Sequence, residues 1–193
     1  MNRCRDDEGL TLIEVVVSLT VMAVFMAMFT TSILQMYRSA NSSEATVLAQ
    51  SQVNLAFLKL DKQIRYAAGI SQPGTGSSTS DPYVEYLTTD GTTATCHQMR
   101  LDSSTLWWRS WTDASGTSPG STWTPLVSGV SGSTPFVYTA PTDSAAFQRL
   151  EVTLTASSGA GSTARSKKTD ITFTALNTNR GSTALTDCAV GRT

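Results

Sequence analysis

Residues 9–34 read Gly-Leu-Thr-Leu-Ile-Glu-Val-Val-Val-Ser-Leu-Thr-Val-Met-Ala-Val-Phe-Met-Ala-Met-Phe-Thr-Thr-Ser-Ile-Leu, and this stretch decides how the chain is organised. The 25 residues from Leu10 to Leu34 carry one charge, that of Glu14. This run predicts a membrane-spanning helix, because about 20 helical residues cross the hydrocarbon layer. A short polar segment, Met-Asn-Arg-Cys-Arg-Asp-Asp-Glu, comes before it. A secretory signal has a shorter apolar region, and its cleavage site follows that region instead of preceding it.

The helix is expected to continue beyond the apolar run, because no Gly or Pro occurs between Leu10 and Ala68. Its second half shows an apolar stripe with steps of three and four residues, which is typical of a helix with one buried face. Gly69 then provides a C-cap signal. The sequence therefore predicts one helix from Leu10 to Ala68, roughly 90 Å long at 1.5 Å per residue. The stripe consists of Ala49, Val53, Phe57, Leu60, Ile64 and Ala67.

From residue 71 the periodicity changes from that of a helix to that of strands. Residues 71–81 have the composition of a loop, and Asp90-Gly91 is a strong hairpin signal. The remaining apolar segments alternate with period two and are separated by Ser, Gly and Pro, so an antiparallel sheet in an α+β fold is expected. Residues 177–193 are expected to form a polar tail. The expected strands are 83–88, 93–101, 105–112, 126–130, 136–140, 147–156 and 170–176.

Composition and cysteine usage argue against several functional classes. With 14 basic and 15 acidic residues, the chain lacks the positive excess of a polyanion-binding protein. Three cysteines and one histidine, with no CxxC pair, do not suggest a zinc site, and we expect no metal or cofactor. Cys96 and His97 are adjacent, and neighbouring strand residues point to opposite faces, so they are badly placed for Cys–His catalysis. We expect no catalytic residues and no enzymatic activity.

The junction at residue 9 has a chemistry of its own. Gly9 has no side chain, so a protease can approach the backbone closely there. A cut after Gly9 frees the amine of Leu10, close to the carboxylate of Glu14. Because a carboxylate in a membrane span costs about 2.5–3.5 kcal/mol on insertion scales, it usually has a partner. That partner can be the amine of its own chain, about 6 Å along the helix axis, or that of a stacked neighbour. A neighbour's amine would set the axial register between subunits.

The segment Gly9-Leu10-Thr11-Leu12-Ile13-Glu14 resembles the prepilin cleavage and methylation motif of type IV pilin-like proteins. The resemblance implies that a membrane prepilin peptidase cuts after Gly9 and methylates the new amine of Leu10. It assigns Glu14 to filament assembly and implies a pilin-like fold, a long helix packed on an antiparallel sheet. The family usually has Phe at the position of Leu10.

A second resemblance, to J-type minor pseudopilins of type II secretion, covers most of the remaining chain more loosely. The end of the expected helix, Phe57 to Ala67, is similar to the corresponding part of that family. The segments that follow the order of the family's sheet are Leu106 to Arg109, Trp123 with Leu126 and Val127, Gly129-Val130, and Phe136 to Tyr138. Minor pilins of a type IV pilus or of a competence filament share this pattern. The sequence therefore does not distinguish a type II secretion system, a type IV pilus and a competence filament. The span has no proline, which favours a minor subunit.

These resemblances imply a division of the chain and a set of partners. Residues 1–9 are the leader, 10–34 the transmembrane and assembly half of the helix, 35–70 its amphipathic half, and 71–193 the extracellular β domain. The protein would first cross the cytoplasmic membrane once, with its N-terminus inside, and then enter an extracellular or periplasmic filament. Its expected partners are prepilin peptidase, other major and minor pilins or pseudopilins, the assembly ATPase and platform protein, and membrane lipid.

Two alternative functions fit the same anchor. One is an adhesive or DNA-capturing tip module of a competence or adhesion pilus, and the other is an enzyme or receptor domain on a single span. Trp107, Trp108, Trp111 and Trp123 bear on this choice, because they can pack the core, contact a partner or stack on a ligand. Core packing is the expectation for these residues.

Two cysteines remain after the expected cleavage. Cys4 is lost with the leader, whereas Cys96 and Cys188 stay in the exported part. A disulfide between them is favoured in an oxidising compartment, and two free thiols are the alternative. Closing a loop of 91 residues would contribute roughly 4–5 kcal/mol in the entropic model.

Overall fold

The computed structural model describes residues 11–75, 80–91, 93–112, 122–158 and 165–191. The chain divides into two compact units, residues 1–43 and residues 44–193, which are described separately. Helix α1 (Leu12–Arg65) contributes residues 12–43 to the first unit and residues 44–65 to the second.

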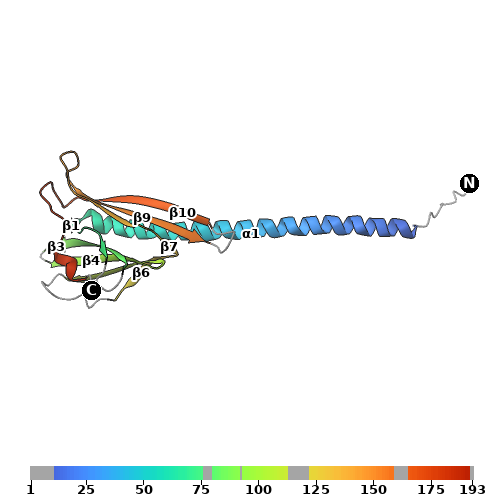
Figure 1. Cartoon of the computed structure of the whole chain (residues 1–193), viewed down its shortest axis with the longest axis horizontal. Helices are drawn as coiled ribbons and strands as arrows, with labels where there is room; N and C mark the ends of the chain where they lie inside the picture. The colour runs from blue at the N-terminus through green and yellow to red at the C-terminus, as the bar shows by residue number, and fades with distance from the viewer. Residues whose placement is uncertain (1–10, 76–79, 92, 113–121, 159–164, 192–193) are drawn as a thin grey trace, which may run out of the picture. The chain divides into compact units, whose positions relative to one another are not determined.

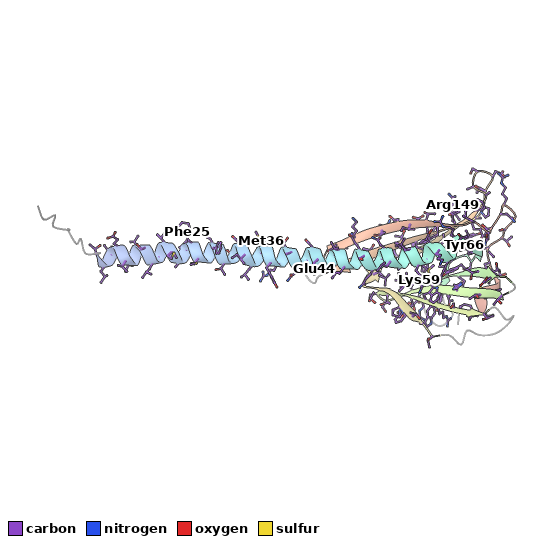
Figure 2. The ribbon with its side chains drawn as sticks, turned by 180° about the vertical axis from the view of Figure 1, so that it is seen from behind. Phe25, Met36, Glu44, Lys59, Tyr66 and Arg149 are labelled. Atoms are coloured by element: carbon purple, nitrogen blue, oxygen red, sulfur yellow. A yellow bond between two sulfur atoms is a disulfide. The ribbon has the colours of Figure 1, made fainter. Side chains whose placement is uncertain are left out.

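The first unit is the apolar part of α1, and its side chains are exposed on every side (Figure 2). Leu12 is 83% exposed and Phe25 is 66% exposed. A helix that is apolar all round suits lipid rather than water. By length and composition this helix could cross a membrane. The expected beginning at Leu10 lies outside the described residues.

The second unit contains two antiparallel sheets rather than the single sheet expected. In sheet A the strand order is β1-β3-β4-β5-β6, with β2 also paired to β3, and in sheet B it is β10-β9-β7, with β8 also paired to β9. With the helix, these sheets give the expected α+β architecture. Sheet A contains β1 (Ala67–Ile70), β2 (Gly74–Thr75), β3 (Pro82–Asp90), β4 (Thr93–Asp102), β5 (Thr105–Thr112) and β6 (Thr124–Ser128). Sheet B contains β7 (Val130–Ser131), β8 (Phe136–Thr139), β9 (Gln148–Ser158) and β10 (Arg165–Ala175).

The last three turns of α1 lie between the two sheets (Figure 1). Leu60 and Ile64 are completely buried, and Phe57 meets Phe173 of β10 edge to face at 5.9 Å between ring centres. Burying such side chains contributes about 1.5–3 kcal/mol each. The predicted stripe is confirmed at Val53, Phe57, Leu60 and Ile64, all of which are buried; the side chain of Ala49 is not among those described.

The predicted end of the helix is wrong. The helix ends at Arg65 instead of Ala68, and residues 67–70 already form β1, antiparallel to β3. Gly69 is therefore a strand residue, paired with Leu87 at an irregularity of the ladder, and it is not a C-cap. The buried Ala67 belongs to this strand and not to the helical stripe. The amphipathic part of the helix thus stops short of the expected boundary at residue 70.

Residues from the far end of the sequence replace the expected glycine cap. Helix termini leave carbonyl groups without intrahelical partners. The Leu176 amide donates to the Arg65 carbonyl at 2.9 Å, and the Asn177 side-chain amide donates to the Tyr66 carbonyl at 2.9 Å. The helix therefore ends where a tertiary contact satisfies it, and no local sequence signal marks that position.

Gly129 divides one expected strand into two. The segment 126–130 was expected to be continuous, but β6 belongs to sheet A and β7 to sheet B. Gly129 lies between them with φ 73°, a backbone conformation that glycine adopts without steric cost. The other expected strands are confirmed, and several are longer than expected. The hairpin at Asp90-Gly91 is confirmed too, because Asp90 pairs with Thr93 and Gly91 has φ 59°.

Gln148 joins three separate segments. Its side-chain oxygen accepts the Ile70 amide of β1 at 2.8 Å, and its side-chain nitrogen donates to the Thr183 carbonyl at 2.7 Å. Its own amide donates to the Thr178 hydroxyl at 2.9 Å. Because Gln148 is fully buried, these bonds replace contacts with water. The residue thereby connects β9 of sheet B, β1 of sheet A and the C-terminal segment.

We expect Gln148→Leu to lower the free energy of unfolding by about 1–3 kcal/mol, because it leaves the buried Ile70 amide without an acceptor. Chemical denaturation followed by circular dichroism measures the change. Gln52→Leu, the same substitution at an exposed helix position, is the matched control and should stay within about 0.5 kcal/mol. Equal stability of the two variants would contradict the bridging role of Gln148.

Candidate functional site

The N-terminal site is built on the first turn of α1. The Thr11 carbonyl accepts the Glu14 amide at 3.0 Å and the Val15 amide at 3.3 Å, and the Thr11 hydroxyl also lies 3.4 Å from the Glu14 amide nitrogen. Thr11 is therefore the N-cap of α1. Glu14 is exposed in the first turn, where the positive end of the helix dipole favours a carboxylate.

Thr11 is a helix-capping residue that was not predicted from the sequence, although a signal for it exists. Thr11 precedes Glu14 by three positions, which is the spacing of a capping box. The cap places the start of α1 directly after Thr11. Gly9, Leu10 and the leader 1–9 lie outside the described residues, so the cut and methylation positions stay predictions.

What this site can do chemically follows from its surroundings. The described residues after Glu14 carry no other charge up to residue 37, and all of them are exposed. In an apolar medium a carboxylate attracts a cation far more strongly than it does in water. The site therefore provides one anionic point on an otherwise apolar helix, suited to pairing with an amine.

The C-terminal segment, expected to be polar apart from Cys188, is attached to sheet A. The 3-10 helix η2 (Asp187–Gly191) lies against sheet A, where Cys188 forms a disulfide with Cys96 of β4 at a Cα–Cα distance of 5.6 Å. Both cysteines are buried. The Gly191 carbonyl accepts hydrogen bonds from the side chains of Gln98 and Arg109.

Gly191 also packs against an aromatic ring. A Cβ atom at this position would lie 2.7 Å from the indole of Trp111, so any larger residue would displace the ring or the segment. Burial lowers the pKa of the Arg109 guanidinium, with Arg100 acting in the same direction. The Gln98 side-chain oxygen accepts from Arg109 at 2.8 Å, and its nitrogen donates to the buried Glu85 carboxylate at 3.0 Å. This polar network holds the segment down beside the disulfide.

Cys96 and His97 do not form a catalytic pair. Cys96 is bonded to Cys188, whereas His97 points to the opposite face of β4 and stacks on Tyr86. The alternation of side chains along a strand separates them, as expected from their adjacency.

Trp108 packs against the core and Trp111 is buried against the disulfide cluster, whereas Trp107 of β5 is half-buried. Trp123 is half-buried on the same side as Trp111, because the guanidinium of Arg109 lies 5.6 Å from the ring centre of Trp111 and 4.2 Å from that of Trp123. The guanidinium of Arg100 lies 4.6 Å from the ring centre of Trp123. Trp108 and Trp111 thus have the packing role expected, and Trp123 anchors two arginines.

Comparison with protein families matches residues 4–30 to the model described as the prokaryotic N-terminal methylation motif. The chain carries this methylation motif. The motif includes the predicted cut after Gly9 and the carboxylate of Glu14, and it extends through the apolar helix to residue 30. Thr11, the helix cap, therefore lies inside the methylation motif.

Comparison with solved structures found a type IV-like pilin from Thermus thermophilus. The two chains are 9% identical with a TM-score of 0.47, over 68% of this chain and 98% of that one. Comparison with the curated proteins gave no match.

Gly9→Val should leave the precursor uncut, because a branched side chain obstructs the approach of the protease to the backbone. Intact mass and N-terminal sequencing of membrane fractions should show wild-type protein beginning at methylated Leu10. Gly69→Val serves as a control far from the junction and should be cut normally. Wild-type protein that begins at Met1 with the peptidase present would contradict this processing.

For the disulfide, we expect peptide mapping of exported protein without reductant to recover the Cys96 peptide joined to the Cys188 peptide. Cys188→Ala should destabilise the domain by up to about 4–5 kcal/mol in the entropic model. Complete alkylation of both cysteines in unreduced protein would be the contrary result.

Proposed function

We propose that this chain is a structural, pilin-type subunit of an extracellular or periplasmic filament. The observation that carries the proposal is the methylation motif at residues 4–30, which includes the first part of α1, where residues 12–41 are all exposed. A processing signal joined to such a helix fits a subunit that first resides in a membrane and later buries the same helix among other subunits. In this proposal no residue is catalytic.

The proposed route begins with a precursor that spans the cytoplasmic membrane, with residues 1–9 on the cytoplasmic side. Prepilin peptidase removes them after Gly9 and methylates Leu10. The assembly ATPase and platform protein then move the subunit out of the membrane, and the apolar parts of α1 pack together with those of neighbouring pilins. The second unit, which is water-compatible and stabilised by its own core, forms the outer layer.

Glu14 is proposed to set the register of this packing. Its carboxylate lies on the first turn of α1, within an otherwise uncharged run. Pairing with the amine of a neighbour removes the free-energy cost of an isolated charge in an apolar medium, and it does so only at one axial position. Apolar packing alone would allow neighbouring helices to slide past one another.

Within the pilin-type class, we propose a minor subunit of the J-type pseudopilin kind, in a type IV pilus-like or type II secretion-like machine. The absence of proline from residues 10–34 supports this choice. The order of the aromatic and apolar segments supports it too, because they occupy consecutive strands β5, β6, β7 and β8.

Glu14→Ala should yield mature, membrane-resident protein that joins the filament poorly, because it removes the charge pair without touching the cut. Removing a carboxylate also makes membrane insertion easier, so an insertion defect is not expected. Quantitative immunoblotting of sheared filaments against membranes measures the ratio. Glu14→Gln should be intermediate at best.

Glu44→Ala, which removes an exposed carboxylate from the second unit, is the matched control and should assemble normally. Accumulation of uncut Glu14→Ala precursor would assign the residue to peptidase recognition instead. Normal incorporation of the Ala variant would mean that apolar packing sets the register.

A further inference from the structure

Three rings stack on the side of sheet A that faces α1. Tyr86 of β3 and His97 of β4 lie 4.7 Å apart with an interplanar angle of 14°, and His97 and Trp108 of β5 lie 5.7 Å apart at 23°. The three side chains come from three neighbouring strands. We refer to Tyr86, His97 and Trp108 as the ring stack.

Two polar residues of α1 hold the helix to the ring stack. The Tyr86 hydroxyl donates to the Gln63 side-chain oxygen at 2.6 Å and accepts from the Trp108 indole nitrogen at 3.0 Å. The Lys59 ammonium lies 4.5 Å from the Trp108 ring centre, and Figure 2 shows Lys59 beside the strands of sheet A. The stack is therefore a contact between helix and sheet as well as part of the sheet.

His97 is the central member of the stack, and one of its nitrogens is unsatisfied. Nε2 lies 2.8 Å from the Thr88 hydroxyl, whereas Nδ1 is buried with no hydrogen-bond partner among the described residues. A neutral imidazole can leave Nδ1 as a bare acceptor. A protonated one carries a second N–H donor there, and a buried charged donor without a partner is costly.

The groups that the structure places in contact with the imidazole carry no charge that would favour its protonation. From β3 come the phenol of Tyr86 and the hydroxyl of Thr88, while the Lys59 ammonium of α1 lies over the ring of Trp108. Burial raises the pKa of the Tyr86 phenol, so that group stays neutral. From β5 comes the uncharged indole of Trp108. Burial lowers the pKa of His97 to about 4, in agreement with this geometry.

We propose that the ring stack is an acid-sensitive clamp between α1 and sheet A, which protonation of His97 opens. The imidazolium would be a buried cation whose Nδ1–H has no acceptor among the described residues. The proposal concerns the second unit alone and does not depend on the proposed role in a filament.

The direction of the pH effect follows from the two protonation states. The pKa of His97 is near 6.5 in the unfolded chain and about 4 in the folded one, so acid favours the unfolded chain. The stabilisation is fully present above about pH 6.5 and is lost as the pH falls toward 4. Each pH unit between these two values changes the folding equilibrium constant tenfold. Protonation of this one group therefore lowers that constant about 300-fold in total.

The test uses the full-length chain in detergent micelles, where His97 is the single histidine and gives one imidazole signal in NMR. We expect that signal to titrate well below pH 6.5, with a change in tryptophan fluorescence over the same range. His97→Phe keeps a ring in the stack but cannot be protonated. This variant should lose less stability than wild type between pH 6.5 and 4.5, as measured by denaturant unfolding.

Titration of His97 near pH 6.5, or an equal acid loss in His97→Phe, would overturn the proposal. The NMR titration of His97 keeps the test decisive if His97→Phe does not fold, because it needs no variant.

Discussion

The burial of one face of α1 between two sheets is the interaction on which the second unit depends. Leu60 and Ile64 have no exposed surface, and the strands of both sheets contribute side chains to the same core. Without the helix each sheet would expose an apolar face, and a sheet with such a face is unstable in water. The helix therefore suits two environments. The part of α1 in the first unit is apolar on all sides, and the part in the second unit is apolar on one side.

The polar contacts between α1 and sheet A fix the rotation and axial position of the helix, which apolar burial alone does not. Hydrophobic contact is non-directional and would allow the helix to rotate or slide by small amounts. Gln63 and Lys59 fix it against the ring stack, while Leu176 and Asn177 fix its last turn. Each of these bonds contributes on the order of 1 kcal/mol, which is small beside the core but specific in direction.

The features that were predictable from the sequence are those that repeat locally. The stripe through Val53, Phe57 and Leu60 follows the helical period, and the strands follow the period of two. The N-cap at Thr11 was also readable, since the Thr-x-x-Glu spacing of Thr11 and Glu14 marks a helix start. Features that depend on contacts between distant parts of the sequence were not predictable. The helix ends at Arg65 because residues 176 and 177 meet it there, and the division at Gly129 depends on which sheet each neighbouring strand joins.

Residues 176–185 supply both the cap on α1 and a hydrogen bond to β1. Asn177 meets Tyr66 across 111 residues of sequence, and Leu185 donates to the Ile70 carbonyl at 2.9 Å. During synthesis, the end of α1 and strand β1 thus lack these hydrogen bonds until residues 176–185 have been made. Contacts of such long sequence separation form slowly, because the entropy cost of closing the loop comes before the contact can stabilise the fold. The second unit consequently completes its fold only after residues 176–185 have left the ribosome.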